Sequence, residues 1–217
     1  MGDPVWILLH ILVLVYWLGG DLGAFYASRL VVDEARPAAG RLAAASILMN
    51  VDMAPRMALI FAFPTGLALS VSRGWLALDF EWVWLAFAVA GVWAALAWLV
   101  HLKAGPLGVV RGLDMAIRLI ALAGLLGAGA GMLAGWIEAP LFLAAKLLLL
   151  ALAIACGLLI RRALAPFGPA FAQLARGEAG PAENAAIRAS LAHAKIYVLT
   201  IWSALLAAAA LGVYTPA

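Results

Sequence analysis

Long uncharged stretches of apolar residues, separated by short polar or basic segments, run through the chain from end to end. A helix of about 20 apolar residues crosses the roughly 30 Å hydrocarbon core of a bilayer. Because glycine, alanine and leucine dominate these stretches, we expect helices rather than the strands of a barrel. The pattern predicts an all-α, polytopic transmembrane bundle, a single membrane domain over residues 1–217. Its six spans are residues 4–28, 49–72, 82–102, 117–137, 139–160 and 190–214.

The composition agrees with this class. Of the 217 residues, 67% are hydrophobic and only 12% are charged, and the mean hydropathy is +1.08. The chain has no P-loop, GxGxxG, HExxH or nucleophile-elbow motif, so the motifs of common soluble enzymes are absent. The single cysteine, Cys156, lies within the fifth predicted span. It excludes a disulfide framework and a covalent haem-attachment motif.

The basic residues are distributed unevenly between the two sides of the predicted spans. The loops on the side of the termini contain only Arg73. Cytoplasmic segments are enriched in lysine and arginine, so this bias predicts a multi-pass protein of the bacterial inner (plasma) membrane with both termini periplasmic. The pI near 9.4 then reflects contact with anionic headgroups and implies no nucleic-acid partner. The residues on the cytoplasmic side are Arg29, Arg36, Arg41, Arg56, Lys103, Arg111, Arg118, Arg161, Arg162, Arg176, Arg188 and Lys195.

Two segments next to the spans have less regular patterns. A helical pattern begins near Gly40 and continues to residue 72, and we expect Pro55 and Pro64 to kink this helix rather than end it. Prolines and glycines break the segment 161–195, which predicts a cytoplasmic loop that is too short for a domain. From residue 183 a helical pattern resumes and runs into the last span.

Two ionisable side chains interrupt otherwise uncharged runs on the side of the termini. His10 lies six residues past Pro4, and Lys146 lies eight residues past Glu138. With about 1.5 Å of rise per residue, both lie roughly 10 Å below the same membrane face, and Thr65 lies at comparable depth. An ionisable residue within the membrane is a candidate functional group. His10 and Lys146 are therefore expected to form one site.

The residues leave several interpretations of this site open. His10 is either a histidine hydrogen-bonded within the bundle or an axial ligand of haem b, for which Trp17 and neighbouring glycines would leave space. Lys146 either snorkels to the headgroups, or serves as a second axial ligand, a general base or a charge partner. His10 is thus the candidate metal ligand, and Trp17 and Lys146 are candidate cofactor contacts.

A second layer of charges is expected about 25 Å below the same face. Asp52 and Arg56 are four residues apart, a spacing that allows an ion pair within one helix. The layer predicts either structural ion pairs near the interface or a site whose arginines bind carboxylates, such as the propionates of a porphyrin. Its members are Asp21, Asp52, Arg56 and Arg118.

Three further features carry weaker signals. His101 and His193 lie at cytoplasmic ends of their spans, where they are interfacial residues or form a bis-histidine site. Met49, Met53 and Met57 are spaced as a stripe along one helix face. Methionine is a soft ligand for Cu(I), although core packing explains the stripe as well.

Parts of the chain resemble the superfamily that contains the HemJ-type protoporphyrinogen oxidases and the CopD-type copper-resistance membrane proteins. The resemblance covers about half the chain, and the third and fourth predicted spans are additional to it. It implies haem b bound through His10, a requirement for Lys146 close to it, and six-electron oxidation of protoporphyrinogen IX to protoporphyrin IX. The matching residues are His10, Tyr16-Trp17-Leu18-Gly19-Gly20, Arg29, Pro55-Arg56-Met57, Pro64-Thr65-Gly66 and Ala145-Lys146-Leu147.

The residues and the resemblance together predict a haem b-binding inner-membrane redox protein. A tetrapyrrole would enter from the bilayer, Arg29 or Arg56 would hold a propionate, and Lys146 and Arg56 are the catalytic candidates. Electrons would pass to a quinone or a respiratory-chain acceptor. The alternative is a CopD-like copper transport protein or a non-catalytic subunit of a larger respiratory complex. The sequence leaves open whether the protein is an enzyme and whether it forms homo- or hetero-oligomers.

Overall fold

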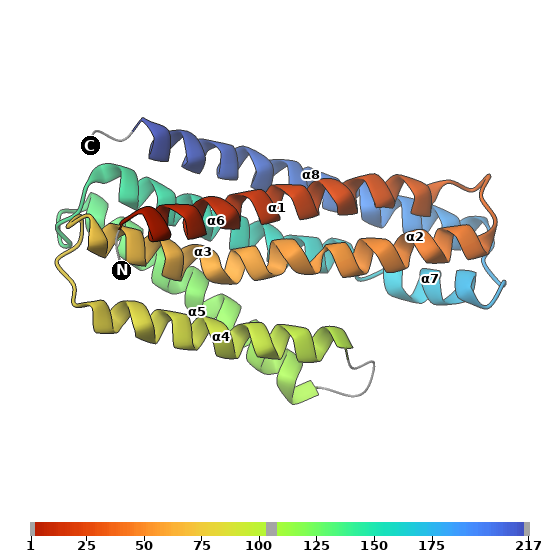
Figure 1. The fold of residues 1–217 in the computed structure, drawn as a ribbon. Helices are drawn as coiled ribbons and strands as arrows, with labels where there is room; N and C mark the ends of the chain where they lie inside the picture. The colour runs from red at the N-terminus through yellow and green to blue at the C-terminus, as the bar shows by residue number, and fades with distance from the viewer. Residues whose placement is uncertain (1–2, 103–107, 215–217) are drawn as a thin grey trace.

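The computed structural model describes residues 3–102 and 108–214, and within these ranges every regular element is a helix (Figure 1). The all-α bundle predicted from the sequence is confirmed. Lys103, one of the basic residues used to predict the topology, lies outside the described residues. The helices are α1 (Asp3–Val32), α2 (Ala38–Val51), α3 (Met53–Ser72), α4 (Phe80–Leu102), α5 (Gly108–Leu133), α6 (Leu141–Ala163), α7 (Phe167–Ala175) and α8 (Pro181–Val213).

Six described segments are long and apolar enough to cross a membrane, and α2 and α3 together form one of them. Large apolar side chains point outward from these segments; Ile11, Trp84 and Ile120, for example, are 52%, 53% and 72% exposed. Such faces suit contact with lipid tails. The N- and C-termini lie at one end of the bundle (Figure 1), called here the termini end. The opposite end, which contains Arg29, Arg161 and Lys195, is called the basic end.

The second predicted span differs from expectation at one residue. The helix that begins at Ala38 is interrupted at Asp52, because α2 ends at Val51 and α3 begins at Met53. Asp52 keeps a right-handed helical backbone (φ −62°, ψ −13°), and residues 38–72 remain one membrane-length helical segment, so Pro55 disturbs the helix without ending it, as expected. Pro55 lies in the first turn of α3, where a missing N–H leaves no hydrogen bond unmade, and it disfavours continuation of the preceding helix. Pro64 lies inside α3 as expected.

The first and last helices, α1 and α8, are much longer than a bilayer core requires. α1 has 30 residues and α8 has 33, which corresponds to about 45–50 Å of helix. At the basic end they enclose, with α2 and α7, a small apolar core that includes Val31 and Ile187. The predicted resumption of helix at 183–195 is confirmed by α8, whereas α7 was not expected. Buried Arg41 caps α1 there, because its Nε donates to the Val31 carbonyl at 2.8 Å.

The central core lies between α1, α3, α4, α5, α6 and α8. α1 packs against α2, α3 and α8, while α6 packs against α5 and α8, and α4 is joined to the bundle through α3 and α5. Trp17 of α1 is 2% exposed and belongs to this core. The inward face of α1 therefore continues from Trp17 towards His10 at the termini end.

Candidate functional site

The strongest candidate site is built around a hydrogen bond between α1 and α3. The Nδ1 atom of His10 lies 3.0 Å from the Oγ1 atom of Thr65. Thr65 is 4% exposed, and its Oγ1 also lies 2.7 Å from the Phe61 carbonyl and 3.2 Å from that of Ala62. The equal depth predicted for His10 and Thr65 is thus confirmed by direct contact.

This arrangement favours one tautomer of a neutral His10. A threonine hydroxyl has a single hydrogen, and we assign it to the Phe61 carbonyl, 2.7 Å away, which is a bond that threonine commonly makes within a helix. The Thr65 oxygen can then only accept from His10, so Nδ1 carries the proton and Nε2 keeps a lone pair. His10 therefore presents an imidazole nitrogen that can bind a metal or accept a proton.

Gly66, the residue after Thr65, provides the space that the imidazole occupies. A Cβ atom placed on Gly66 would lie 3.2 Å from Cε1 of His10 and 3.8 Å from its Nδ1. The ring thus packs directly on the α3 backbone. A larger residue would push it from Thr65.

Lys146 of α6 is partly buried near the same end of the bundle. Its charge lies close enough to His10 for the two side chains to interact electrostatically. Its Nζ lies 5.7 Å from the centre of the Phe142 ring and packs against α8, where a Cβ on Gly212 would lie 2.8 Å from it. Within the described ranges, neither His10 nor Lys146 forms an ion pair. The fold therefore brings together the two residues that the sequence paired.

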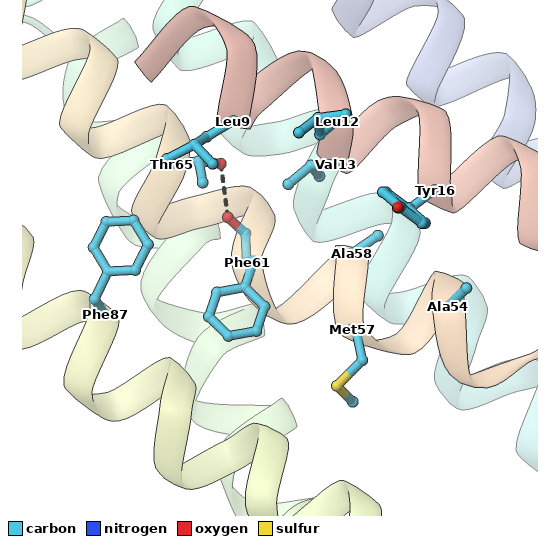
Figure 2. Close-up of a pocket in the computed structure, with 10 residues that line it drawn as sticks. All are labelled: Leu9, Leu12, Val13, Tyr16, Ala54, Met57, Ala58, Phe61, Thr65 and Phe87. Carbon is cyan, nitrogen blue, oxygen red and sulfur yellow. Dashed lines mark hydrogen bonds between the residues drawn. The ribbon is translucent and has the colours of Figure 1, made fainter. Parts of the chain in front are cut away.

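An apolar groove of about 380 Å³ lies between α1, α3 and α4 and has Thr65, the hydrogen-bond partner of His10, in its wall (Figure 2). Its walls include Leu12 and Tyr16 from α1, Met57 and Thr65 from α3, and Phe87 from α4. The volume falls within the range of roughly 300–1,000 Å³ that is usual for ligand sites. Thr65 connects the groove with His10, because it lines the former and bonds to the latter.

The other predicted site residues lie away from His10. Trp17 is in the central core, one to two turns along α1. Arg29 lies nineteen residues from His10, roughly 28 Å along the helix, and its Cζ is 5.5 Å from the Phe25 ring centre. Arg56 lies nine residues from Thr65, about 14 Å along α3. Its Nε donates to Asp52 at 2.7 Å, which confirms the expected pair.

Sequence reasoning missed Asp114, the best-connected charged residue of the described chain. Asp114 of α5 is 2% exposed and accepts hydrogen bonds from Arg118, from Trp93 of α4 at 3.0 Å and from Arg161 of α6 at 2.9 Å. Its four-residue spacing to Arg118 matches that of Asp52 and Arg56, so the sequence already contained the pattern that predicts an ion pair between Asp114 and Arg118. The contact with Arg161 depends on tertiary structure.

Asp21, the remaining inner-layer residue, does not pair with a cation. It is 9% exposed and accepts a hydrogen bond of 3.2 Å from the indole nitrogen of Trp202 on α8. The ion pair expected of this layer is therefore not formed by Asp21, which bonds across helices to a neutral indole instead.

The weaker candidates are spread through the basic end. His101 Nε2 lies 3.1 Å from the Asn50 Oδ1, and His193 is exposed on α8. Met53 is 2% exposed in the interior, whereas Met49 is 52% exposed, so the methionines do not line one cavity. Within residues 3–102 and 108–214, no cluster of three or more histidine, cysteine, aspartate or glutamate residues could hold a metal.

No protein-family model matches the chain, and no curated protein or solved structure is significantly similar to it. The resemblance to the HemJ- and CopD-type superfamily therefore stays a prediction that depends on the residues around His10, Arg56 and Lys146.

Proposed function

We propose that this chain is a redox protein of the bacterial inner membrane that binds haem b through His10 and oxidises protoporphyrinogen IX to protoporphyrin IX. The observation that carries the proposal is the hydrogen bond between His10 and Thr65. It leaves Nε2 of His10 with the lone pair that an axial ligand needs, while a bond to the other nitrogen holds the ring. The donor chemistry of the site therefore suits haem b, which supplies one-electron redox chemistry when bound.

Lys146 is proposed to handle protons in this reaction. Oxidation of the tetrapyrrole releases six electrons and six protons. A quinone takes up two of each, so three quinones balance the reaction. Lys146 is close to His10 and has no carboxylate partner within the described residues. Its amine lies next to the Phe142 ring and to the α8 backbone at Gly212, and a lysine amine in its neutral form can accept a proton from the substrate.

The groove supports lateral binding of an apolar tetrapyrrole from the bilayer. It lies between α1, α3 and α4 and has Thr65 in its wall. Met57 and Ala54, which also line it, flank Arg56 in sequence. We assign the propionate contact to Arg56 rather than Arg29, because Arg56 is the arginine nearer to this groove along the chain and a guanidinium binds carboxylates through two hydrogen bonds.

The proposal also fixes an orientation in the membrane. The basic end is assigned to the cytoplasm because lysine and arginine gather there. Reporter fusions after Ala217 and within residues 176–181 should report periplasm and cytoplasm respectively. The reverse pattern would place His10 near the cytoplasmic face and overturn the assignment.

The absorption spectrum of the purified protein tests the haem directly. A Soret band and a pyridine haemochrome typical of haem b are expected, and His10→Ala should abolish the band or shift it strongly. His101→Ala and His193→Ala are matched controls that should keep the parental spectrum, since both residues lie at the basic end. A colourless parent protein with stoichiometric copper would instead support the copper-transport alternative.

A further inference from the structure

A buried group of charges at the basic end has no part in the proposed haem site. Asp114 is its centre. It accepts hydrogen bonds from the Trp93 indole nitrogen at 3.0 Å, from Arg118 Nε at 3.1 Å and from Arg161 at 2.9 Å, and Arg118 also forms an ion pair with Oδ1 at 3.1 Å. One carboxylate thus faces two guanidiniums.

The cations around Asp114 outnumber the anions. Arg118 and Arg161 share this one carboxylate, which leaves a net charge of +1. Arg56 lies within electrostatic reach of Arg161, but its charge is balanced by Asp52. Asp52 in turn interacts electrostatically with Asp21, so the excess of positive charge is confined to Arg118 and Arg161 around Asp114.

The excess charge is accessible on one side only. The Arg118 side chain is 8% exposed and its Cζ lies 5.3 Å from the Trp93 ring centre. The Arg161 side chain is 37% exposed and belongs to the last turn of α6. An uncompensated cation at this depth is costly, whereas an oxyanion approaching from the basic end would meet the free N–H groups of a planar guanidinium.

We propose that Arg161 and Arg118 bind one phosphate group at the basic end of the bundle. Either the headgroup of an anionic phospholipid or a free phosphate could present this group, since both offer the oxyanion that a guanidinium binds through paired hydrogen bonds. This phosphate site is separate from His10, so the experiment that tests it does not depend on haem binding.

The test uses the full chain in phosphatidylcholine nanodiscs with two probes, phosphatidylglycerol and inorganic phosphate. Native mass spectrometry counts retained phosphatidylglycerol, and the shift in melting temperature reports binding of either probe. A shift with phosphatidylglycerol alone identifies the lipid as the source, and a shift with inorganic phosphate identifies a soluble anion. Loss of a charge-assisted bond should weaken binding to Arg161→Gln roughly tenfold or more.

The matched control is Arg162→Gln, an exposed arginine in the same turn of α6, which should bind as the parent does. Arg161→Lys keeps the charge but loses the planar fork, so its affinity should lie between those of Arg161→Gln and the parent; it also provides a measurement if Arg161→Gln misfolds. Equal losses in Arg161→Gln and Arg162→Gln, or no binding of either probe to the parent, would overturn the proposal.

Discussion

The two ends of the bundle differ in whether their ionisable side chains form ion pairs. At the basic end, Asp114 is joined to two arginines and Asp52 to Arg56. Near the termini end, His10 and Lys146 lie close together, and no ion pair within the described ranges includes either of them. His10 is held instead by a neutral hydroxyl.

This difference separates charges that stabilise the fold from groups that are available for chemistry. Asp52 with Arg56, and Asp114 with one of its arginines, form compensated pairs that stabilise the fold, and the second arginine at Asp114 is the excess charge assigned to phosphate binding. An imidazole and an amine placed in an apolar bundle without counter-charges gain little stability, so their presence there points to function.

The largest expected effect tests the basic end. Asp114→Asn leaves the Arg118 and Arg161 guanidiniums without their carboxylate and should lower the free energy of unfolding by about 3–5 kcal/mol, as for other broken buried pairs. Asp52→Asn breaks a pair whose side chains are 32% and 41% exposed, and should cost about 1 kcal/mol or less. Unfolding in mixed micelles with increasing dodecyl sulfate measures both. Equal costs would contradict the distinction between buried and exposed pairs.

Substitutions of Lys146 test the termini end. Arginine keeps the charge but cannot deprotonate, so Lys146→Arg should fold, alter the haem spectrum and lose roughly 100-fold or more of the oxidase activity. Lys146→Met, which is apolar and of similar length, should be at least as stable as the parent. A parental spectrum and activity in Lys146→Arg would mean that Lys146 only reaches the headgroups, and His10 would become a structural histidine.

A smaller effect is expected from Thr65→Val, which keeps the shape of the side chain but removes the acceptor for His10. The unpaired Nδ1–H should lower the free energy of unfolding by about 1–3 kcal/mol and shift the Soret band. Thr65→Ser is the control, because it retains the hydroxyl. If valine and serine gave the same spectrum, the hydrogen bond would not orient His10.

The smallest effect concerns the glycine beneath the imidazole. Gly66→Ala would place a Cβ 3.2 Å from His10 Cε1, so the ring must move by a few tenths of an ångström, with a cost of about 1 kcal/mol or less. Gly19→Ala meets no atom within 4 Å and should stabilise α1 by roughly 0.5–1 kcal/mol. The melting temperatures of the two variants show whether each substitution lowers or raises stability. A higher melting temperature in both variants would show that the space above Gly66 is larger than its contacts indicate.

Local patterns predicted the features that depend on distance along a helix. Apolar runs predicted the six spans, and four-residue spacing predicted the pair of Asp52 and Arg56. Depth along the helix axis placed Thr65 level with His10. Asp114 could have been found in the same way from its spacing to Arg118. The sequence predicted that Pro55 would disturb the helix over residues 38–72 without ending it, and the tertiary structure placed the one-residue interruption at Asp52.

The sequence by itself thus determined the membrane class, the uneven distribution of charge and the position of each ionisable group along its helix. The reason is that rise and period per residue are nearly constant in a helix. Only the tertiary structure decided that Trp202 bonds to Asp21, that Arg161 reaches Asp114 and that Gly212 lies against Lys146. These contacts join residues far apart in the chain, and they depend on how each helix is rotated and tilted against its neighbours, which side-chain packing sets.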